Sequence, residues 1–542
     1  MASLAQYYEQ LIRKRQANVP DEISPATHGV NWADAPSKLT IFQGVARVPL
    51  FPHLNSAKLN ESIGCNDRKD RARVPRASLE VVSDLLLLGA GILGRRVDLN
   101  WNGQTPESSR HTKALYSRGP ASGGGLYPTE IYLISQNVGG LPSGVYHYDN
   151  AHHALARLRT GNYQWMLKDA CNHPSVESAD FLIIVTARFW KNLFKYYNFA
   201  FQVVTQDAGC LSDCIQQTAW LLGLSTTTLY WFRDSSFVEI LGLESDEEAV
   251  CAVIAVRGAE ASQSGRGRRN PGTTQFPGPL PRMSHTRYER SRHVFLPELL
   301  REVHRETLVN GEQRPPVDRL PEWEAGNAEN LTSFELGRGC SMPSGFVAAL
   351  MERGSSWGRF RCHPRLSWND LSNLLCFLNC SARHATDAYT LPRGPSAVRV
   401  CLIARNVSGL PPGAYDHDPC RGQLLPITAS QIDSQLQKAY FLENYNLDQV
   451  AAILVVVGRL QPVLASWGSR GLRIMNAEAG MVAQRCYTAA SALGLGCGAA
   501  LGLDATQINR AVGVDGENES SILLIFIGHQ VPSAYAYDFR LY

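Results

Sequence analysis

A glycine-rich turn is the stretch of this sequence whose residue types are best suited to holding a ligand. It consists of Ser122, Gly123, Gly124, Gly125, Leu126, Tyr127 and Pro128. Glycines adopt positive φ angles without strain and leave backbone N–H groups uncovered, which suits close approach to a flat or anionic ligand. Glycine and proline also mark ordinary connections of every kind, so the turn alone leaves both interpretations open.

Part of the segment around this turn occurs twice in the chain. Residues 132–148, YLISQNVGGLPSGVYHY, recur at 401–417 as CLIARNVSGLPPGAYDH, at a shift of 269. From Phe181 to Arg257 the shift is 271 without a gap, and Asp207-Ala208-Gly209 corresponds to Glu478-Ala479-Gly480. A constant register over so long a stretch indicates an internal duplication.

The elements that must position the turn follow from the apolar pattern. Strands are expected at 131–135, 145–148, 181–190 and 249–256, and a buried helix at 78–88. A second helix is expected to begin near Asp207, where an acidic residue favours the N-terminal dipole, and to close at Gly223. The second copy repeats this order, so each copy is predicted to be one α+β unit.

The length of 542 residues predicts more than one domain. We expect a solvated lead-in at 1–75 that begins with a helix at 4–16, with a peptide-docking segment as the alternative, and then one domain at 76–257. A basic linker rich in Gly and Pro follows at 258–334, and a second domain at 335–542. Residues 261–292 hold seven arginines and one glutamate, which favours a solvated linker, with a clamp for an acidic peptide or carrier domain as the alternative.

Composition narrows the class of protein. Apolar residues make up 44% of the chain, and the formal charge of +3 gives no global field that would favour nucleic acid or an anionic membrane. The N-terminus lacks the apolar core of a signal peptide, and the apolar runs are too short to span a bilayer, so a cytoplasmic enzyme is expected.

Cysteine and histidine spacing predicts neither a disulfide framework nor a metal site. The 13 cysteines form no CxxC pair, and Cys210 and Cys214 are expected to be buried apolar side chains. His147, His152 and His153 lie on a predicted strand and its turn, a spacing that gives no tetrahedral set. They are expected to face solvent.

Four motifs together carry a resemblance to a known family. They are SGGGLYPTEIYLI, NVGGLPSGVYHYD, the strand–FKY–helix unit, and GLGCGAALGLD with INRAVGVDGENESSILLIFIG. With them the chain resembles the SagB/McbC-type flavin oxidases of the nitroreductase superfamily, which use FMN to oxidise thiazoline or oxazoline rings in peptides. The resemblance covers roughly 76–257 and 335–529. Because such proteins are typically homodimers with FMN in the interface, it implies two tandem nitroreductase-like domains forming a monomeric pseudo-dimer.

The two copies keep different parts of the site that the resemblance implies. The first keeps SGGGLYP and the pair Lys195-Tyr196, similar to the catalytic Lys-Tyr pair of azoline oxidases, where the second has Ser466-Trp467. The second keeps ERGSSWGRF at 352–360, similar to an Arg-x-Ser phosphate signature. The implied cofactor-binding set is the Ser122–Tyr127 turn with Arg353, Ser355, Arg359, Arg470, Arg473, Glu478 and Gly480. One composite FMN site is therefore expected.

The chemistry of these residue types agrees with that division. A guanidinium answers a phosphate bidentately and a serine hydroxyl supplements it, which suits Arg353 and Ser355. Azoline oxidation requires a base beside the ring. Lys195, with Phe194, Tyr196 and Tyr197 as neighbours, would have its neutral form favoured by desolvation, and Tyr196 could relay the proton.

The sequence therefore predicts an FMN-dependent azoline dehydrogenase of peptide natural-product biosynthesis. Its substrate would be a heterocyclised precursor peptide or a carrier-bound intermediate, with a cyclase or synthetase as partner and no nucleic acid or membrane. One alternative is another flavin enzyme of the superfamily, which reduces nitro or ene groups or desaturates a small molecule with NAD(P)H. A second is a catalytically degenerate scaffold.

Overall fold

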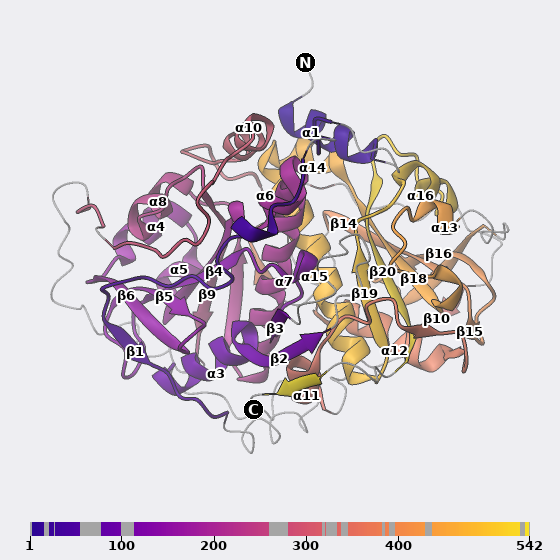
Figure 1. The fold of residues 1–542 in the computed structure, drawn as a ribbon, viewed down its shortest axis with the longest axis horizontal. Coiled ribbons are helices and arrows are strands. Elements are labelled where there is room, and N and C mark those ends of the chain that lie inside the picture. Colours follow the sequence, from indigo (N-terminus) through magenta and orange to yellow (C-terminus); the bar gives the residue numbers. More distant parts are fainter. Residues whose placement is uncertain are drawn as a thin grey trace.

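The structure is a computed structural model in which two large β-sheets flank a central pair of helices (Figure 1). Its mixed α+β architecture matches the fold class predicted from sequence. The residues that it describes are 3–15, 21–25, 28–54, 77–98, 113–258, 280–283, 285–316, 320, 333–337, 345–381, 385–389, 396–428, 436–531 and 537–540.

The first sheet is built mainly from the first copy. Its interior strands are apolar on both faces, because a helical layer covers each side. In spatial order the strands are β1 (Arg47–Pro49), β6 (Ala154–Thr160), β5 (Gly144–Asp149), β4 (Thr129–Ser135), β7 (Phe181–Arg188), β9 (Glu248–Arg257), β8 (Ser225–Leu229) and β13 (Ala385–Thr386).

The second sheet repeats this order with the equivalent strands of the second copy. β4 and β14 begin 269 residues apart, as the sequence shift predicts. The strands are β10 (Phe334–Glu335), β17 (Gln423–Thr428), β16 (Gly413–Asp418), β14 (Val398–Ala404), β18 (Ala452–Gly458), β20 (Ser520–Gln530) and β11 (Phe360–Arg361), with β19 (Gly496–Ala500) also paired to β20.

Two long helices form the contact between the sheets. α7 (Ala200–Leu221) belongs to the first copy and α15 (Arg470–Ala492) to the second, and they lie side by side at the centre (Figure 1). A Cβ on Gly209 would lie 1.8 Å from the carbonyl oxygen of Ala477. A Cβ on Gly480 would lie 1.9 Å from that of Gln206. Glycine at both equivalent positions is therefore what lets the two backbones approach so closely.

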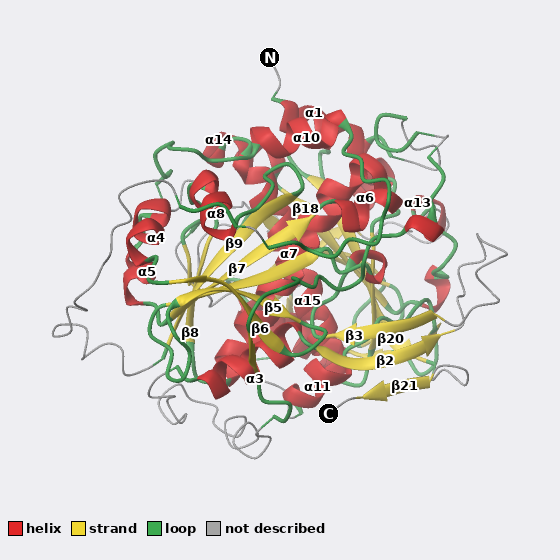
Figure 2. Ribbon diagram, turned by 60° about the vertical axis from the view of Figure 1, so that its left-hand side comes forward, coloured by secondary structure: helices red, strands yellow, loops and turns green. Residues whose placement is uncertain are grey.

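The second copy also contributes strands to sheets of the first. β13, from the second copy, pairs in parallel with β8 and so extends the first sheet. Near the other end of the chain, β21 (Tyr537–Arg540) pairs with β2 (Ile92–Asp98), which in turn pairs with β3 (Lys113–Arg118) (Figure 2). β2 and β3 belong to the first copy, so the C-terminal strand of the second copy extends a sheet of the first.

The lead-in packs against the first domain, contrary to the solvated segment expected. In α1 (Leu4–Arg13), Tyr8 is fully buried and donates its hydroxyl to the carbonyl oxygen of Asn198 at 2.9 Å. β1 pairs with β6 as an edge strand. Three-residue strands that pair over about a hundred residues leave little local signal, which is why the sequence pattern missed it.

Part of the expected linker is also packed. In α10 (Glu298–Glu306), Leu300 and Val303 are fully buried, and Glu306 accepts hydrogen bonds from the first backbone N–H groups of α1. A plain tether is therefore wrong for this part. Arg266, Arg268 and Arg269, the core of the predicted basic segment, lie outside the described residues, while Arg282 is exposed.

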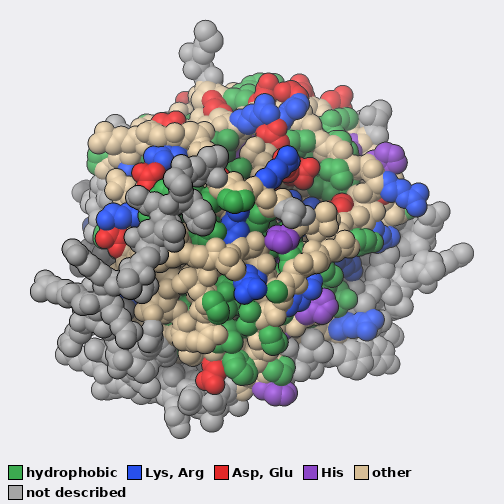
Figure 3. Space-filling model, turned by 90° about the vertical axis from the view of Figure 1, so that its left-hand side faces the viewer, with side chains coloured by type: hydrophobic (Ala, Val, Ile, Leu, Met, Phe, Trp, Pro, Cys, Tyr) green, Lys and Arg blue, Asp and Glu red, His purple; other side chains and the backbone are tan. Residues whose placement is uncertain are grey.

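The remaining helices cover the sheets, and within the described residues none is long and apolar enough to cross a membrane. They are α3 (Leu79–Ala90), α4 (Gln164–Cys171), α5 (Pro174–Ser178), α6 (Trp190–Tyr196), α8 (Asp234–Leu241), α11 (Phe346–Glu352), α12 (Trp368–Ser381), α13 (Leu436–Ala439), α14 (Leu460–Trp467) and α16 (Ala505–Ala511). Short strands β12 (Leu366–Ser367) and β15 (Val407–Ser408) pair beside α12. Acidic and basic side chains are interspersed on the described surface of the first-domain face (Figure 3).

The central helix starts seven residues earlier than the sequence suggested. α7 begins at Ala200, so Asp207 lies in its second turn and does not mark its N-terminus. The prediction of a dipole-stabilising cap at Asp207 is wrong. The carboxylate instead accepts hydrogen bonds from the glycine-rich turn. Cys210 and Cys214, on the same helix, are buried as expected.

We expect Gly480→Ala to destabilise the protein by about 3 kcal/mol or more, because the new methyl meets backbone and cannot be relieved by a rotamer change. Gly29→Ala is the matched control, since a Cβ there would meet nothing within 4 Å. Urea unfolding of both variants measures the difference. Equal unfolding free energies for the two would show that the helices do not need this glycine contact.

Candidate functional site

The glycine-rich turn lies directly against the Lys195-Tyr196 pair. Gly124 and Gly125 both have a φ of 64°, a left-handed conformation that favours glycine. A Cβ on Gly124 would lie 2.7 Å from the Tyr196 hydroxyl and 3.0 Å from Lys195 Nζ, whereas one on Gly125 would meet nothing within 4 Å. The structure thus brings together two features that are about 70 residues apart in sequence.

Asp207 holds the start of the turn. Its carboxylate accepts hydrogen bonds from Ser122 Oγ at 2.6 Å and from the backbone N–H of Gly123 at 2.8 Å. Ser122 Oγ in turn accepts the N–H of Tyr127 at 2.9 Å, which closes the loop. Burial raises the pKa of Asp207 to about 7, although both hydrogen bonds oppose the shift.

Residues of the second copy form hydrogen bonds to the same loop from the other side. Arg353, at the end of α11, donates from Nε to the Gly119 carbonyl at 2.7 Å and from Nη2 to those of Arg118 and Pro120. On α15, Gln484 Oε1 accepts the N–H of Ala121 at 2.8 Å. The loop before the glycine turn is therefore a composite of both copies.

Lys195 and Tyr196 form the last residues of α6. Lys195 Nζ lies 5.0 Å from the centroid of the Tyr196 ring and 5.9 Å from that of Trp32, an exposed residue of the lead-in. No described residue forms an ion pair or hydrogen bond with this ammonium group. Lys195 is therefore free to interact with a ligand at the turn.

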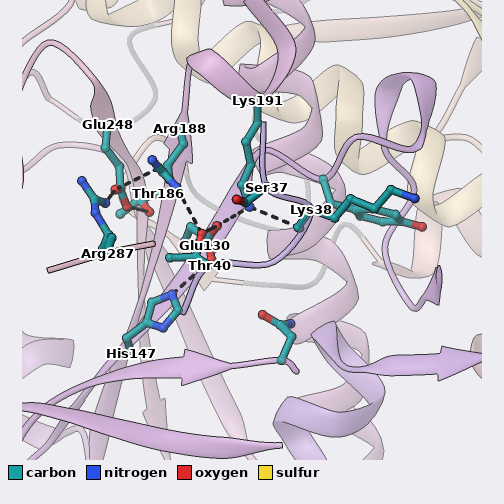
Figure 4. A network of polar contacts seen from close by, with 12 residues as sticks. Ser37, Lys38, Thr40, Glu130, His147, Thr186, Arg188, Lys191, Glu248 and Arg287 are labelled. Carbon is teal, nitrogen blue, oxygen red and sulfur yellow. Dashed lines mark hydrogen bonds and ion pairs between the residues drawn. The ribbon is translucent and has the colours of Figure 1, made fainter. Parts of the chain in front are cut away.

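A buried network of charges fixes α6 and the start of β4 beneath the turn (Figure 4). Glu130 contacts Lys191 Nζ at 2.6 Å, His147 Nε2 at 3.1 Å and Thr40 Oγ1 at 2.5 Å. Burial alone would raise the pKa of Glu130, but Lys191 and His147 hold it well below its usual value. Because Lys191 lies one helical turn before Lys195, this ion pair orients the segment that carries the candidate base.

Asn192 is a site residue that the sequence analysis missed. Its side chain is fully buried, and neither its Oδ1 nor its Nδ2 has a hydrogen-bond partner among the described residues. Nδ2 lies 3.9 Å from a Cβ built on Gly123. Asn192 and Lys195 are three residues apart and share a helix face, which is the signal that could have indicated it. A buried amide left without partners beside the turn is what a bound polar ligand would satisfy.

Two predicted cofactor-binding residues of the second copy form their interactions away from the glycine turn. Arg470 pairs with Asp234 at 3.0 Å and donates to the Tyr230 carbonyl. Arg473 donates to Thr307 Oγ1 at 2.6 Å and to the Val250 carbonyl. Both guanidinium groups are buried and join α15 to the first sheet and to the segment after α10. The structure does not bring them to the glycine turn.

Glu478 and Gly480 have structural surroundings that mirror those of the first copy. Glu478 accepts hydrogen bonds from Ser396 Oγ at 2.5 Å and from the N–H of Ala397, as Asp207 does from its own loop. Gly480 is the helix-crossing glycine described above. We therefore leave Glu478, Gly480, Arg470 and Arg473 out of the site that we propose.

Ser355 and Arg359 lie in the short loop that Arg353 opens. Ser355 Oγ is 3.4 Å from the Tyr445 hydroxyl, and the backbone N–H of Arg359 donates to the Ser356 carbonyl at 3.0 Å. Leu126, from the turn, packs on the main hydrophobic core. The loop at 354–359 thus follows directly after Arg353 and contacts Tyr445, another residue of the second copy.

The three histidines are not solvent-facing as a set. His147 is fully buried on Glu130, and His153 contacts Ser83 Oγ and the Tyr148 hydroxyl, while His152 is exposed and pairs with Asp149. The prediction that His147 faces solvent is wrong, because the strand that carries it is covered on both faces.

The family of the chain follows from comparison with known proteins. The sequence profile of the nitroreductase family matches residues 78–258 and 410–529, more than half of the chain and one segment in each copy. The chain belongs to the nitroreductase family.

Individual proteins are also similar to this chain. A crystal structure of an Anabaena variabilis protein described as a nitroreductase covers 98% of this chain and 100% of its own, with a TM-score of 0.73 and 22% identity. A Methanocaldococcus jannaschii protein named as a nitroreductase is 26% identical over 140 residues, 25% of this chain and 68% of that protein. The Escherichia coli microcin synthetase complex matches 34% of this chain and 69% of its own at 22% identity with a TM-score of 0.27, too low to indicate function.

We expect Asp207→Asn to change how stability depends on pH. A raised pKa means that the folded state holds the proton more tightly than the unfolded state, so Asp207 costs stability as pH rises from about 4 to about 7. The asparagine removes this loss while its oxygen still accepts the Gly123 N–H. Its unfolding free energy relative to wild type should therefore increase across this window.

Urea unfolding between pH 4.5 and 7.5 measures the effect, with Asp448→Asn as the control at an exposed carboxylate. A difference between Asp207→Asn and wild type that does not vary with pH would contradict the raised pKa.

Proposed function

We propose that the protein is an FMN-dependent oxidoreductase with one flavin site, built from the glycine turn and Lys-Tyr pair of the first copy and the Arg353 loop of the second. One observation carries this proposal. The turn lies within van der Waals distance of Lys195 and Tyr196, and the same loop is gripped by Arg353. Membership of the nitroreductase family supports the flavin.

The residues present suit an FMN. The backbone at Gly125 is open, since a Cβ there would meet nothing within 4 Å, and this suits close approach of a flat ring, while Gly124 lets the turn lie against Tyr196. The unpaired amide of Asn192 is a donor and acceptor for the ring edge or the ribityl chain. Arg353 Nη1 makes no hydrogen bond to a described residue, and with Ser355 Oγ it would hold the phosphate.

The chain's own groups would then do the acid–base chemistry. A bound flavin supplies a two-electron acceptor that takes hydride from a substrate carbon. Lys195 Nζ, beside the turn and without an acidic partner among the described residues, would take the proton from the neighbouring carbon. The hydroxyl of Tyr196 lies at the same point of the turn and would share that proton.

For the substrate we propose a thiazoline or oxazoline in a heterocyclised precursor peptide or a carrier-bound intermediate. Its ring loses one proton and one hydride and becomes aromatic, and the reduced flavin must then be reoxidised by an external acceptor such as dioxygen. The motifs around Gly124 and Lys195 support this choice. The names of two relatives, both described as nitroreductases, favour the alternative in which the enzyme reduces a nitro group.

We expect Lys195→Ala to keep its flavin, seen as an unchanged visible spectrum, yet to lose about 10²–10⁴ in rate on an azoline peptide. Turnover is followed by a loss of two mass units from the peptide. Lys168→Ala, at an exposed lysine paired to Glu177, is the control and should match wild type.

Full activity in Lys195→Ala would contradict the assignment of the base. Turnover of a nitroarene with NAD(P)H, together with no reaction on any azoline, would replace the azoline substrate by the alternative. A protein that binds no flavin would contradict both.

A further inference from the structure

Arg15 lies just after α1, and aromatic rings surround its guanidinium group. Its Cζ lies 3.6 Å from the centroid of Phe199, in the first copy, and 5.8 Å from that of Phe441, in the second. Within the described part of the chain, no carboxylate pairs with Arg15 and its side chain makes no hydrogen bond. Burial lowers its pKa to about 10, so the group is still a cation at neutral pH.

This arrangement leaves the donors of Arg15 unused. A guanidinium that stacks on an aromatic ring presents its face to that ring, while its five N–H groups point outward in its own plane. Partly buried donors without an acceptor cost stability, and a carboxylate or phosphate that accepts two parallel hydrogen bonds offsets that cost.

The position of Arg15 connects it to the proposed site. Phe199 packs edge-on against Tyr196 with 6.3 Å between ring centroids, and Tyr196 borders Gly124. On the other side, the N–H of Phe441 donates to the carbonyl of Gly502, in the loop after β19. The lead-in thus brings a cation to a point where both copies meet.

Arg15 and Lys195 thus lie against one aromatic segment, 196–199, and neither has an acidic partner among the described residues. The unneutralised guanidinium of Arg15 raises the local concentration of anions. An uncharged substrate would make no use of Arg15.

We propose that Arg15 binds an anionic group, a carboxylate or a phosphate, of the compound oxidised or reduced at the Lys195-Tyr196 pair. The inference rests on the proposed function for the reaction, but the anion site itself stands on the contacts of Arg15. Through Arg15, the lead-in takes part in the selection of the substrate.

The test is calorimetric titration of the purified full-length protein with benzoate, a carboxylate with an apolar ring, and separately with inorganic phosphate. Arg15→Gln should bind at least tenfold more weakly than wild type, and Arg15→Lys should fall between, since it keeps the charge but not the planar fork. Lys14→Gln, which removes an exposed charge from the adjacent residue, should bind as wild type does.

Binding of benzoate alone would indicate a substrate carboxylate, and displacement of benzoate by phosphate would indicate a phosphate group. The proposal is overturned if neither anion binds wild type, or if Arg15→Gln binds both as tightly as wild type while showing the same unfolding temperature. The titration needs no flavin. A flavin-free protein that still loses anion binding on Arg15→Gln would therefore contradict the proposed function and leave the anion site in place.

Discussion

The close approach of α7 and α15 sets the distance between the two copies, and the candidate site depends on that distance. Gly209 and Gly480 let the backbones meet. Two residues before Gly209, Asp207 holds the glycine turn, and four residues after Gly480, Gln484 holds the residues just before it. Asp207 and Gln484, two of the groups that hold the loop, are thus carried on the same two helices, next to the contact, so any change in helix spacing would move both of them.

Fusion of the copies explains why the two halves differ. A homodimer must encode every part of its site in one subunit, whereas a tandem pair is held together at a fixed ratio within one chain. Asp207 and Glu478 do the same work in their own halves, each holding a loop that precedes a central strand. What differs is the rest of the site. Lys195-Tyr196 corresponds to Ser466-Trp467, which are buried, and the Arg353 loop belongs to the second copy alone. The halves share this framework, and the site that we propose takes its glycine turn and Lys-Tyr pair from the first copy and Arg353 from the second.

The sequence predicted the duplication and most strands, because these follow from register and local pattern, and the family resemblance implied that the glycine turn and the Lys-Tyr pair share one site. It did not predict contacts that depend on tertiary structure. Asp207 looked like a helix cap because an acidic residue at a helix start and one that accepts bonds from a distant loop have the same local sequence. Arg470 and Arg473 were expected among the cofactor-binding residues, whereas the partners that they contact come from the other copy and from the segment after α10. Asn192 had only its helical spacing from Lys195 as a signal, and its burial without partners became visible only in the structure.

The central claim is that both copies build one flavin site, and the flavin-to-chain ratio of the purified protein tests it most directly. Absorbance of released FMN against protein concentration should give one flavin per wild-type chain. Arg353→Ala should hold much less, because a lost charge-assisted contact to phosphate costs about 1.5–3 kcal/mol and the loop before the turn loses its grip from the second copy. Two flavins per chain, or an undiminished ratio in Arg353→Ala, would contradict the composite site.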